Sequence, residues 1–256
     1  MKNIEVKILN PEVVANAEKM MVCGARLTQR GHNIHNMDDF LALYNKDYQK
    51  STARAMANLP HDTIKRFGVI NIAIVGASRR FLAQITRHQA GVTFMSASLQ
   101  YSNYSGNADF VVPYEILEKG EFEVNRYIDT CKEQMAEYEH TVQMGIDHDA
   151  AGYIAPQGLR NVLIISANPV ALQHMIGIRT CRRNTLETRY VMLKIWNELY
   201  KLSPEMFGKS GPFCMNGPCK EGNMCCGKPI NKAWSPMDII KADFPLLIEE
   251  DSTDEN

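Results

Sequence analysis

Residues 67–89, FGVINIAIVGASRRFLAQITRHQ, join a run of β-branched residues to a stretch with helical spacing. The dense Val and Ile content before Ser78 predicts a buried β-strand. The Ser78 hydroxyl can accept a hydrogen bond from the backbone of the next turn, which is typical of a helix start. Along that predicted helix, Phe81, Ile85 and His88 recur at i, i+4 and i+7, so they share one face. The segment therefore predicts a strand followed at once by an amphipathic helix.

Three more helical segments and a region of short strands surround this unit. Apolar side chains at helical spacing predict helices over residues 122–144 and 186–202, and a further helix that starts near Asn168. Pro204 is expected to stop the 186–202 helix. Residues 108–115, ADFVVPYE, are typical of short strands. The combination predicts the α+β class, with a mixed sheet and packed helices.

The bulk composition is that of a globular protein. The chain has 256 residues, of which 45% are hydrophobic and 22% charged, and its formal net charge is -1, so no general attraction to a nucleic acid polymer is expected. There is no apolar run of about 18 residues, so no membrane span is expected. The first residues lack the apolar stretch of a signal peptide, which favours the cytoplasm. We expect one domain over residues 1–248 and an acidic, disordered tail over 249–256.

The cysteines do not follow a disulfide or zinc pattern. There are seven, an odd number that does not suggest a disulfide framework in a chain of this size. Four lie in residues 211–229, GPFCMNGPCKEGNMCCGKP, and these are Cys214, Cys219, Cys225 and Cys226. Structural zinc sites usually show tighter paired spacing, and no C-x-x-C pair occurs here. A Gly- and Pro-rich surface loop with free thiols is favoured over a zinc site, and no metal is predicted.

Residues 84–102, QITRHQAGVTFMSASLQYS, place an Arg-His pair ahead of a cluster of hydroxyl side chains. A helix that carries Gln84 and Arg87 on one face, followed by a hydroxyl-rich loop, can bind a phosphate or the edge of a pyrimidine. Arg offers a rigid fork of donors for this purpose, and Gln offers an amide that can pair with a base. The alternative is a solvated helix face followed by an edge strand rich in Ser and Thr.

Two further segments carry polar groups typical of binding sites. Residues 59–63, LPHDT, predict a turn or a capped helix start that holds His61 and Thr63. Residues 168–191, NPVALQHMIGIRTCRRNTLETRYV, contain a dense group of charged residues: Arg179, Arg182, Arg183, Glu187 and Arg189. Such a cluster can bind an anionic ligand, or it can be a surface on which Glu187 pairs with Arg183.

In this order, the segments resemble the flavin-dependent thymidylate synthases. The family pattern has Arg-His-Arg, then Ser after seven residues, inside Ser-x-Arg-Tyr-Ser. The residues that match it, with one residue inserted, are Arg87, His88, Ser98, Tyr101 and Ser102. Residues 61–63 resemble the family's His-Glu-Thr, and residues 168–189 match Asn-x-Arg-x-Leu-x-His…Leu-Arg…Glu-x-Arg without gaps. Some members also carry a cysteine segment like residues 211–227.

The resemblance implies an activity, cofactors and an assembly. It implies an enzyme that makes dTMP from dUMP, with methylene-tetrahydrofolate as carbon donor, FAD as redox carrier and NADPH as reductant. The implied structure is a flavin-dependent thymidylate synthase-like fold of the α+β class. The implied assembly is a homotetramer whose active sites lie where subunits meet.

The resemblance also assigns roles by matched position. The residues implied around dUMP are Gln84, Arg87, Ser98, Gln100 and Arg179, of which Ser98 and Gln100 come from a neighbouring subunit. The residues implied along the flavin are His61, Thr63, His88, Gln89, Asn168 and His174. Among these, Arg179, Arg87 and Ser98 are the implied catalytic residues. Arg179 would contact the pyrimidine, and Ser98 would bind phosphate without acting as a nucleophile.

Four cations of the family pattern are absent, because Gln89, Gln100, Gly152 and Val170 stand where the pattern has arginine. A hydrogen bond to a charged group is worth about 1.5–3 kcal/mol, so losing two from one phosphate site weakens it by about 100-fold unless other arginines substitute. The candidate substitutes are Arg79, Arg80, Arg182 and Arg183. The sequence therefore leaves three functions open: the family's reaction, modification of dUMP or another pyrimidine nucleotide to a different product, or a non-catalytic relative that binds nucleotide or flavin.

Overall fold

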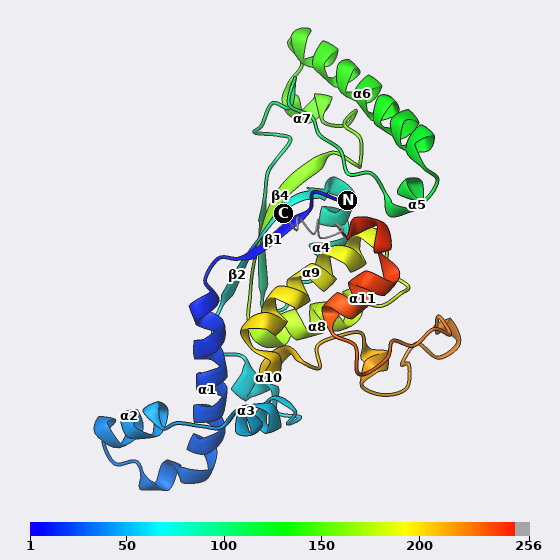
Figure 1. The fold of residues 1–256 in the computed structure, drawn as a ribbon. Coiled ribbons are helices and arrows are strands. Elements are labelled where there is room, and N and C mark those ends of the chain that lie inside the picture. Colours follow the sequence, from blue (N-terminus) through cyan, green and yellow to red (C-terminus); the bar gives the residue numbers. More distant parts are fainter. Residues whose placement is uncertain (249–256) are drawn as a thin grey trace, which may run out of the picture.

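The computed structural model describes residues 1–248, which form a small sheet with most of the helices packed on one of its faces (Figure 1). The strands are β1 (Glu5–Ile8), β2 (Ile70–Ser78), β3 (Val92–Ser96) and β4 (Arg160–Ala167). The α-helices are α1 (Pro11–Arg30), α2 (Met37–Asn45), α3 (Lys50–Ala57), α4 (Arg79–Ile85), α5 (Tyr114–Leu117), α6 (Glu121–Gln143), α7 (His148–Ala151), α8 (Pro169–Arg179), α9 (Leu186–Leu202), α10 (Pro204–Phe207) and α11 (Pro236–Asp243). Short 3-10 helices lie at Gly31–Asn33, Asp62–Lys65, Phe213–Met215, Gly222–Met224 and Pro245–Leu247. The α+β class is confirmed, and the predicted tail over 249–256 lies outside the described residues.

The sheet has the order β1-β2-β4-β3, and each neighbouring pair is antiparallel. The prediction of a mixed sheet was therefore wrong. Antiparallel neighbours do not need a helix crossing over the sheet face, so the long α6 segment between β3 and β4 is free to extend away from the sheet (Figure 1). Register places Ile72 opposite Ile165, and both side chains are fully buried on the helix-covered face.

The junction between β2 and α4 forms as its sequence predicts. The Ser78 hydroxyl accepts a hydrogen bond from the Phe81 amide at 3.1 Å and caps α4. Gly76 forms a bulge in β2, with φ of +85°, where a Cβ atom would lie 2.8 Å from the Asn3 carbonyl oxygen. The helix ends at Ile85, earlier than predicted, so Arg87 does not lie on a helix face.

The pairing of the strands tests two predictions. β3 is an edge strand that contains Thr93 and Ser96, which matches the alternative of an edge strand rich in Ser and Thr. The strands predicted over residues 108–115 were wrong, because only Phe110 pairs, in an isolated bridge with Leu159. Pro113 then precedes α5 and has no N–H group to continue a ladder.

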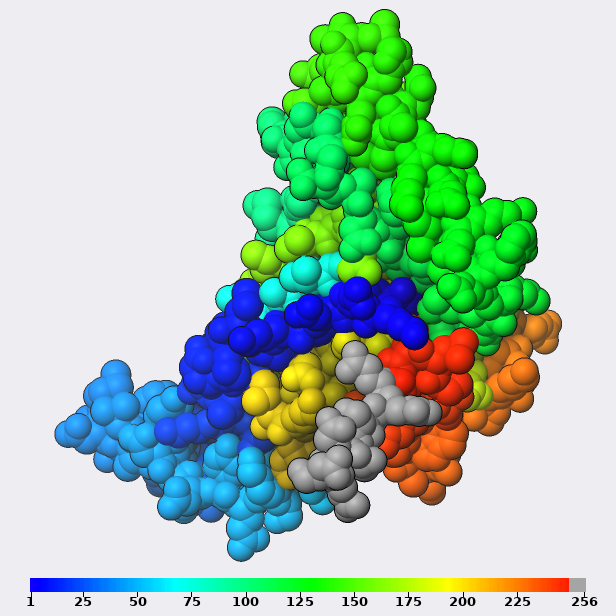
Figure 2. Space-filling view, turned by 45° about the horizontal axis from the view of Figure 1, so that its top comes forward, coloured from blue at the N-terminus to red at the C-terminus, as the bar shows by residue number. Residues whose placement is uncertain are grey.

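The main core lies between the sheet and the helices α1, α4, α8, α9 and α11. Helix α9 is buried on most of its surface, and its Trp196 ring nitrogen donates to the Phe207 carbonyl at 2.8 Å. A second cluster joins α6 and α7 to the segment after β3, through residues such as Leu99, Met135 and Tyr138. Figure 2 shows the α6 segment in green and the α2 segment in light blue at opposite ends of the molecule.

Four apolar side chains gather on the face of the sheet that the helices leave open. Val75 lies opposite Val162, and Met95 lies opposite Ile164, so the four side chains share this face. Their exposed fractions are 46% for Val75, 46% for Val162, 71% for Met95 and 40% for Ile164. A contiguous apolar patch on a sheet is typical of a surface that another protein surface covers.

Candidate functional site

Arg179, the last residue of α8, connects two parts of the predicted site. Its Nε donates to Nε2 of His88 at 2.8 Å, and its Nη2 donates to the carbonyl oxygen of Gln84 at 2.9 Å. Its Nη1 donates to Oδ1 of Asn184 at 3.3 Å. These bonds fix the guanidinium between the turn after α4 and the turn after α8. The structure thus brings together three residues that the sequence predicted, although the chain separates them widely.

His88 is an uncharged acceptor in this arrangement. Partial burial lowers its pKa from 6.5 to about 4, and the charges of Arg179 and His174 add to the effect. Since Nε2 accepts from Arg179, the proton of the neutral ring belongs on Nδ1. The ring meets that of His174 edge-on, with centroids 6.1 Å apart. The two rings therefore form a polar wall beside the arginine, in which His88 is neutral.

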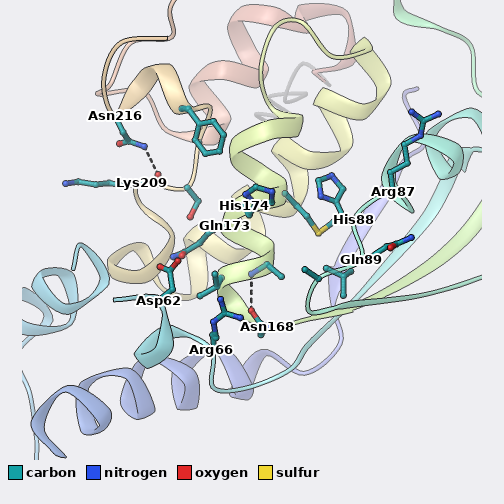
Figure 3. Close-up of a pocket in the computed structure, with 18 residues that line it drawn as sticks. Asp62, Arg66, Arg87, His88, Gln89, Asn168, Gln173, His174, Lys209 and Asn216 are labelled. Atoms are coloured by element: carbon teal, nitrogen blue, oxygen red, sulfur yellow. Dashed lines mark hydrogen bonds between the residues drawn. The ribbon is translucent and has the colours of Figure 1, made fainter. Parts of the chain in front are cut away.

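A cavity of about 610 Å³ opens next to this wall (Figure 3). Five predicted residues line it, namely Arg87, His88, Gln89, Asn168 and His174. The lining residues that the sequence analysis did not assign to the site include Asp62, Arg66, Gln173, Lys209, Ser210, Phe213 and Asn216. Cavities of about 300–1,000 Å³ are typical of sites for cofactors and other small molecules.

The start of α8 forms one edge of the cavity. The Asn168 side chain accepts from the Ala171 amide at 3.0 Å and caps the helix, and Pro169 follows it at the first helical position. Gly91 lies against this cap with φ of +73°, and a Cβ atom there would be 2.6 Å from Nδ2 of Asn168. A glycine is needed at this turn so that the end of the Arg-His segment can lie against α8.

The charge along the cavity is positive. Within residues 1–248, the side chains of Arg66, Arg87 and Lys209 make no hydrogen bond or ion pair. The one carboxylate in the lining, Asp62, is bound to Lys65 at 2.9 Å, and this bond holds the pKa of Asp62 below its usual value. The unpaired cations make the cavity suited to an anionic ligand such as a phosphate or a diphosphate.

Arg66 and Lys209 were missed because no local pattern marks them. Arg66 follows the predicted HDT turn by three residues, and that proximity was the available signal. Lys209 lies after α10, in a segment that the sequence analysis did not connect with the site. Its place in the lining depends on the fold alone.

Other predicted residues do not line the cavity. His61 and Thr63 are exposed at the 3-10 helix Asp62–Lys65, whose Asp62 does line it. Gln84 contributes its backbone carbonyl to Arg179. Ser98 accepts from the Gln100 amide at 3.1 Å, outside the cavity of its own chain.

Three arginines of the segment 168–191 bind partners elsewhere in the chain and do not face a common site. Arg182 and Arg189 both pair with Asp243, at 2.8 and 2.5 Å, and Arg183 donates to the Met224 carbonyl. These contacts contradict both predictions, a shared anion site and Glu187–Arg183 surface pairs. They also occupy Arg182 and Arg183, so neither is free to replace the missing cations.

Glu187 instead anchors the β2–α4 junction. Its carboxylate accepts from the Ser78 amide at 2.7 Å and from the Ser78 hydroxyl at 2.5 Å. Burial raises the pKa of Glu187, although the bonds from Ser78 oppose the shift. The position is therefore structural in this chain, since it ties α9 to the start of α4.

The cysteine segment lies beside a second cavity, of about 530 Å³. All seven cysteines are free thiols. Among the residues that the structure describes, no three His, Cys, Asp or Glu side chains are placed to share a metal ion. Likewise, no helix within residues 1–248 is both long and apolar enough to cross a bilayer.

Comparison with known protein families gives one match. The model of the family described as "Thymidylate synthase complementing protein" matches residues 12–205. Among curated relatives, the flavin-dependent thymidylate synthase of Thermococcus onnurineus is 28% identical over 76% of this chain and 83% of its own length. That of Clostridium tetani is 24% identical over 89% of this chain and 95% of its own length.

Two solved structures resemble the chain in fold. A UMP/dUMP methylase, PolB from Streptomyces cacaoi, bound with 5-Br dUMP, superposes with a TM-score of 0.63 at 16% identity, over 81% of this chain and 94% of its own. Thymidylate Synthase X from Helicobacter pylori, with FAD and dUMP, gives a TM-score of 0.56 at 16% identity, over 81% of this chain and 98% of its own. At this identity the two likenesses concern the fold.

Proposed function

Because the chain belongs to the thymidylate synthase complementing protein family, we propose that it transfers a one-carbon unit from methylene-tetrahydrofolate to C5 of dUMP, giving dTMP. In this proposal FAD is the redox carrier and NADPH is the reductant. The curated relatives are named flavin-dependent thymidylate synthases, which supports the reaction class.

The observation that carries the proposal is the junction of Arg179 with His88 beside a cationic cavity. Arg179 Nε binds His88 at 2.8 Å, and the neutral His88 ring lines the cavity with His174. A guanidinium that is held by fixed acceptors on one side can present its remaining N–H groups to a ligand without reorganisation. Electrostatic support of this kind suits a reaction in which negative charge develops on a pyrimidine ring.

The residues of the cavity fit FAD. Arg66, Arg87 and Lys209 supply unpaired positive charge for a diphosphate, and the amide ends of Gln89 and Asn168 supply donors and acceptors. The imidazole rings of His88 and His174 offer a polar edge for the flavin ring. When bound, the flavin supplies the electrons and carries the one-carbon unit. The chain's own residues bind and orient the reactants and exclude water from them.

The proposal assigns the substrate to the Arg179 side of the site. Arg179 contacts the pyrimidine, and Arg87 and Gln84 lie around the nucleotide, with Ser98 as a phosphate ligand. Ser98 and Gln100 lie away from the cavity of their own chain, which supports their contribution to the site of a neighbouring subunit. His61 and Thr63, at the rim, border the flavin.

The assembly proposed is a homotetramer, and the open sheet face supports it. Val75, Met95, Val162 and Ile164 form an exposed apolar patch that a second copy of the chain can bury. Ser98 and Gln100 come two and four residues after the end of β3, the strand that carries Met95. Packing copies through the sheet would therefore bring these residues near another subunit.

The test is mass spectrometry of the nucleotide after incubation of FAD-loaded protein with dUMP, methylene-tetrahydrofolate and NADPH. The expected product is dTMP, absent when any one of the three reactants is omitted. A ¹³C label in the methylene group of the folate must appear in the product. Unchanged dUMP in protein that still binds FAD would exclude this reaction.

A second candidate is the modification of another pyrimidine nucleotide, or of dUMP to a different product such as a hydroxymethyl derivative. It is favoured by Gln89 and Val170, which line the cavity where the family pattern has arginine. The fold likeness to a UMP/dUMP methylase is compatible with it. The same assay with UMP and dCMP in place of dUMP separates the two candidates, because each predicts a different labelled product.

A further inference from the structure

The second cavity concentrates the thiols of the chain. Five of the seven cysteines line it, namely Cys181, Cys214, Cys219, Cys225 and Cys226. They come from the turn after α8 and from residues 214–226, which the fold brings to one wall. The other two, Cys23 and Cys131, are buried in helices, where burial raises the pKa of each thiol. Reactive chemistry is therefore expected at the cavity and not at these two positions.

The Cys225 thiol interacts with two of the other four thiols, those of Cys219 and Cys226. The Cys219 thiol forms a hydrogen bond with the sulfur of Cys225. The sulfur of Cys225 also accepts from the Gly227 amide at 3.4 Å. Arg183 lies beside it, because the guanidinium donates to the carbonyl of the preceding residue, Met224. Donors and a cation around one sulfur are the surroundings that favour a thiolate.

The pKa of Cys225 follows from these contacts. The amide of Gly227 lowers it most, the Cys219 thiol lowers it further, and the charge of Arg183 adds to the effect, while burial opposes it. Cys225 is exposed, so a small oxidant can reach it. It is therefore suited to be the attacking thiol of a pair.

The neighbouring Cys226 is held differently. Its thiol donates to the Lys228 carbonyl and accepts from the Lys228 amide at 3.4 Å, so its partners belong to its own turn. A bridge between Cys225 and Cys226 is disfavoured, because consecutive Cα atoms are about 3.8 Å apart and disulfides need about 4.4–6.8 Å. Cys219, whose thiol bonds to the Cys225 sulfur, is therefore the favoured partner of Cys225.

The segment between the pair can adjust. Gly222, between the two cysteines, has φ of +52°, and Gly227, two residues after Cys225, has φ of +69°. A Cβ atom at either position would meet nothing within 4 Å. The backbone there is held by turn bonds such as Met224 N–H to the Glu221 carbonyl at 2.9 Å. A small movement of this exposed loop therefore does not disturb the core.

We propose that Cys219 and Cys225 form a redox-active pair, which closes to a disulfide by exchange with a small disulfide such as oxidised glutathione. The Cys225 thiolate attacks one glutathione sulfur, forms a mixed disulfide and releases one glutathione thiolate. The Cys219 thiolate then attacks the Cys225 sulfur and releases the second. The two protons of the cysteine thiols end on the two reduced glutathiones, so the chain is oxidised by two electrons and glutathione disulfide is reduced by two.

A disulfide between Cys219 and Cys225 would act on a segment that lines both cavities. The Phe213 ring lines both cavities, and it packs on α8 so closely that a Cβ atom at Gly177 would lie 2.4 Å from it. Lys220, the residue after Cys219, lies over this ring at 5.5 Å. The redox state of the pair therefore changes the restraint on a segment that forms part of the wall of the first cavity.

The experiment oxidises the reduced, full-length protein with glutathione buffers of rising disulfide content and traps free thiols with N-ethylmaleimide. Trypsin cleaves after Lys220, so Cys219 and Cys225 fall on different peptides and a bridge joins them. We expect a mass loss of about 2 Da, corresponding to two hydrogens, and a linked pair of peptides before any other bridge forms. Cys219→Ser and Cys225→Ser must remove the linked pair.

The control variants are Cys214→Ser and Cys226→Ser, since each removes the other thiol on one of the two peptides. Both must keep the linked pair if the bridge joins Cys219 to Cys225. A linked pair that survives in Cys225→Ser or Cys219→Ser overturns the proposal, and so does its absence from the oxidised wild-type protein. Zinc that copurifies at about one ion per chain and shields these thiols until a chelator is added would also overturn it, in favour of a metal site.

Discussion

The guanidinium of Arg179 donates from Nε to Nε2 of His88 at 2.8 Å, across a separation of 91 residues. The bond joins the end of α8 to the turn after α4. It holds Arg179, which is not one of the residues that line the cationic cavity, beside the neutral ring of His88, which is. Each partner acts on the other: burial and then the charge of Arg179 lower the pKa of His88, and His88 orients the guanidinium. The consequences below follow from this relationship and from the contacts around it.

Replacement of Arg179 by Ala should abolish nucleotide-dependent oxidation of the reduced flavin and leave the fold intact. Bonds from a charged group are worth about 1.5–3 kcal/mol each, so a loss of about 100-fold or more is expected. Stopped-flow absorbance of the flavin, with and without dUMP, measures it. Arg126→Ala, on the exposed face of α6, is the matched control and should change nothing. Unchanged oxidation in Arg179→Ala would contradict the assigned role.

His88 should titrate near pH 4 and not near 6.5, because burial and the charges of Arg179 and His174 disfavour its protonated form. Between these two pH values the unfolded chain binds a proton that the folded chain does not. This residue therefore makes the protein less stable as the pH falls through that window. NMR titration of the labelled histidine ring measures the pKa. Arg179→Ala should move it upward, and an unchanged value would show that Arg179 does not act on His88.

Arg66→Ala and Lys209→Ala should each weaken FAD binding by about 10-fold, since each removes an unpaired cation from the cavity. The loss should shrink at high salt, where charge interactions are screened. Fluorescence titration of apoprotein with FAD at low and high ionic strength provides the measurement. Lys132→Ala, an exposed lysine of α6, serves as the control. If Lys132→Ala weakens FAD binding as much as the cavity variants do, the cavity cations have no special role in that binding.

Glu187→Ala should lower the free energy of unfolding by about 1–3 kcal/mol, because the buried hydrogen-bond donors of Ser78 lose their acceptor. Glu187→Gln keeps an acceptor and should cost less. The raised pKa of Glu187 means that the wild-type carboxyl favours folding at low pH and loses part of this contribution as the pH rises through its folded value. Urea unfolding should therefore show that the stability of Glu187→Gln rises relative to that of the wild type as the pH increases through the folded pKa of Glu187. A constant difference would contradict this assignment.

Met95→Lys should reduce the assembly of the protein if the apolar sheet face is a subunit interface. Met95 is 71% exposed on that face, on the edge strand β3, and a buried lysine without a partner is costly. Met144→Lys is a close control, because Met144 is 67% exposed but lies at the end of α6, away from the sheet. Light scattering coupled to size-exclusion chromatography should give a smaller species for Met95→Lys alone. Equal masses for both variants would exclude this face as the interface.

Local structure followed the sequence closely where short-range interactions decide it. Ser78 and Asn168 start their helices because a side-chain oxygen can cap the turn that follows, and α9 ends at Leu202, ahead of Pro204. Residues 108–115 failed because a β-propensity pattern says nothing about whether a partner strand is within reach. Arg87 lies beyond α4 because Thr86 caps the helix one turn earlier than the apolar spacing suggested.

The residues of the candidate site fall into the same two groups, those that local sequence indicates and those that only the fold brings together. The sequence by itself indicated the family, strand β2, the helices α4, α6, α8 and α9, and several lining residues, because cap, periodicity and motif are local properties of the chain. Only the tertiary structure decided that Arg179 meets His88, that Arg66 and Lys209 face the same cavity, and that Glu187 binds Ser78 and not Arg183. A charged side chain takes its role from the partners and solvent around it, and segments far apart in the sequence supply them only after folding.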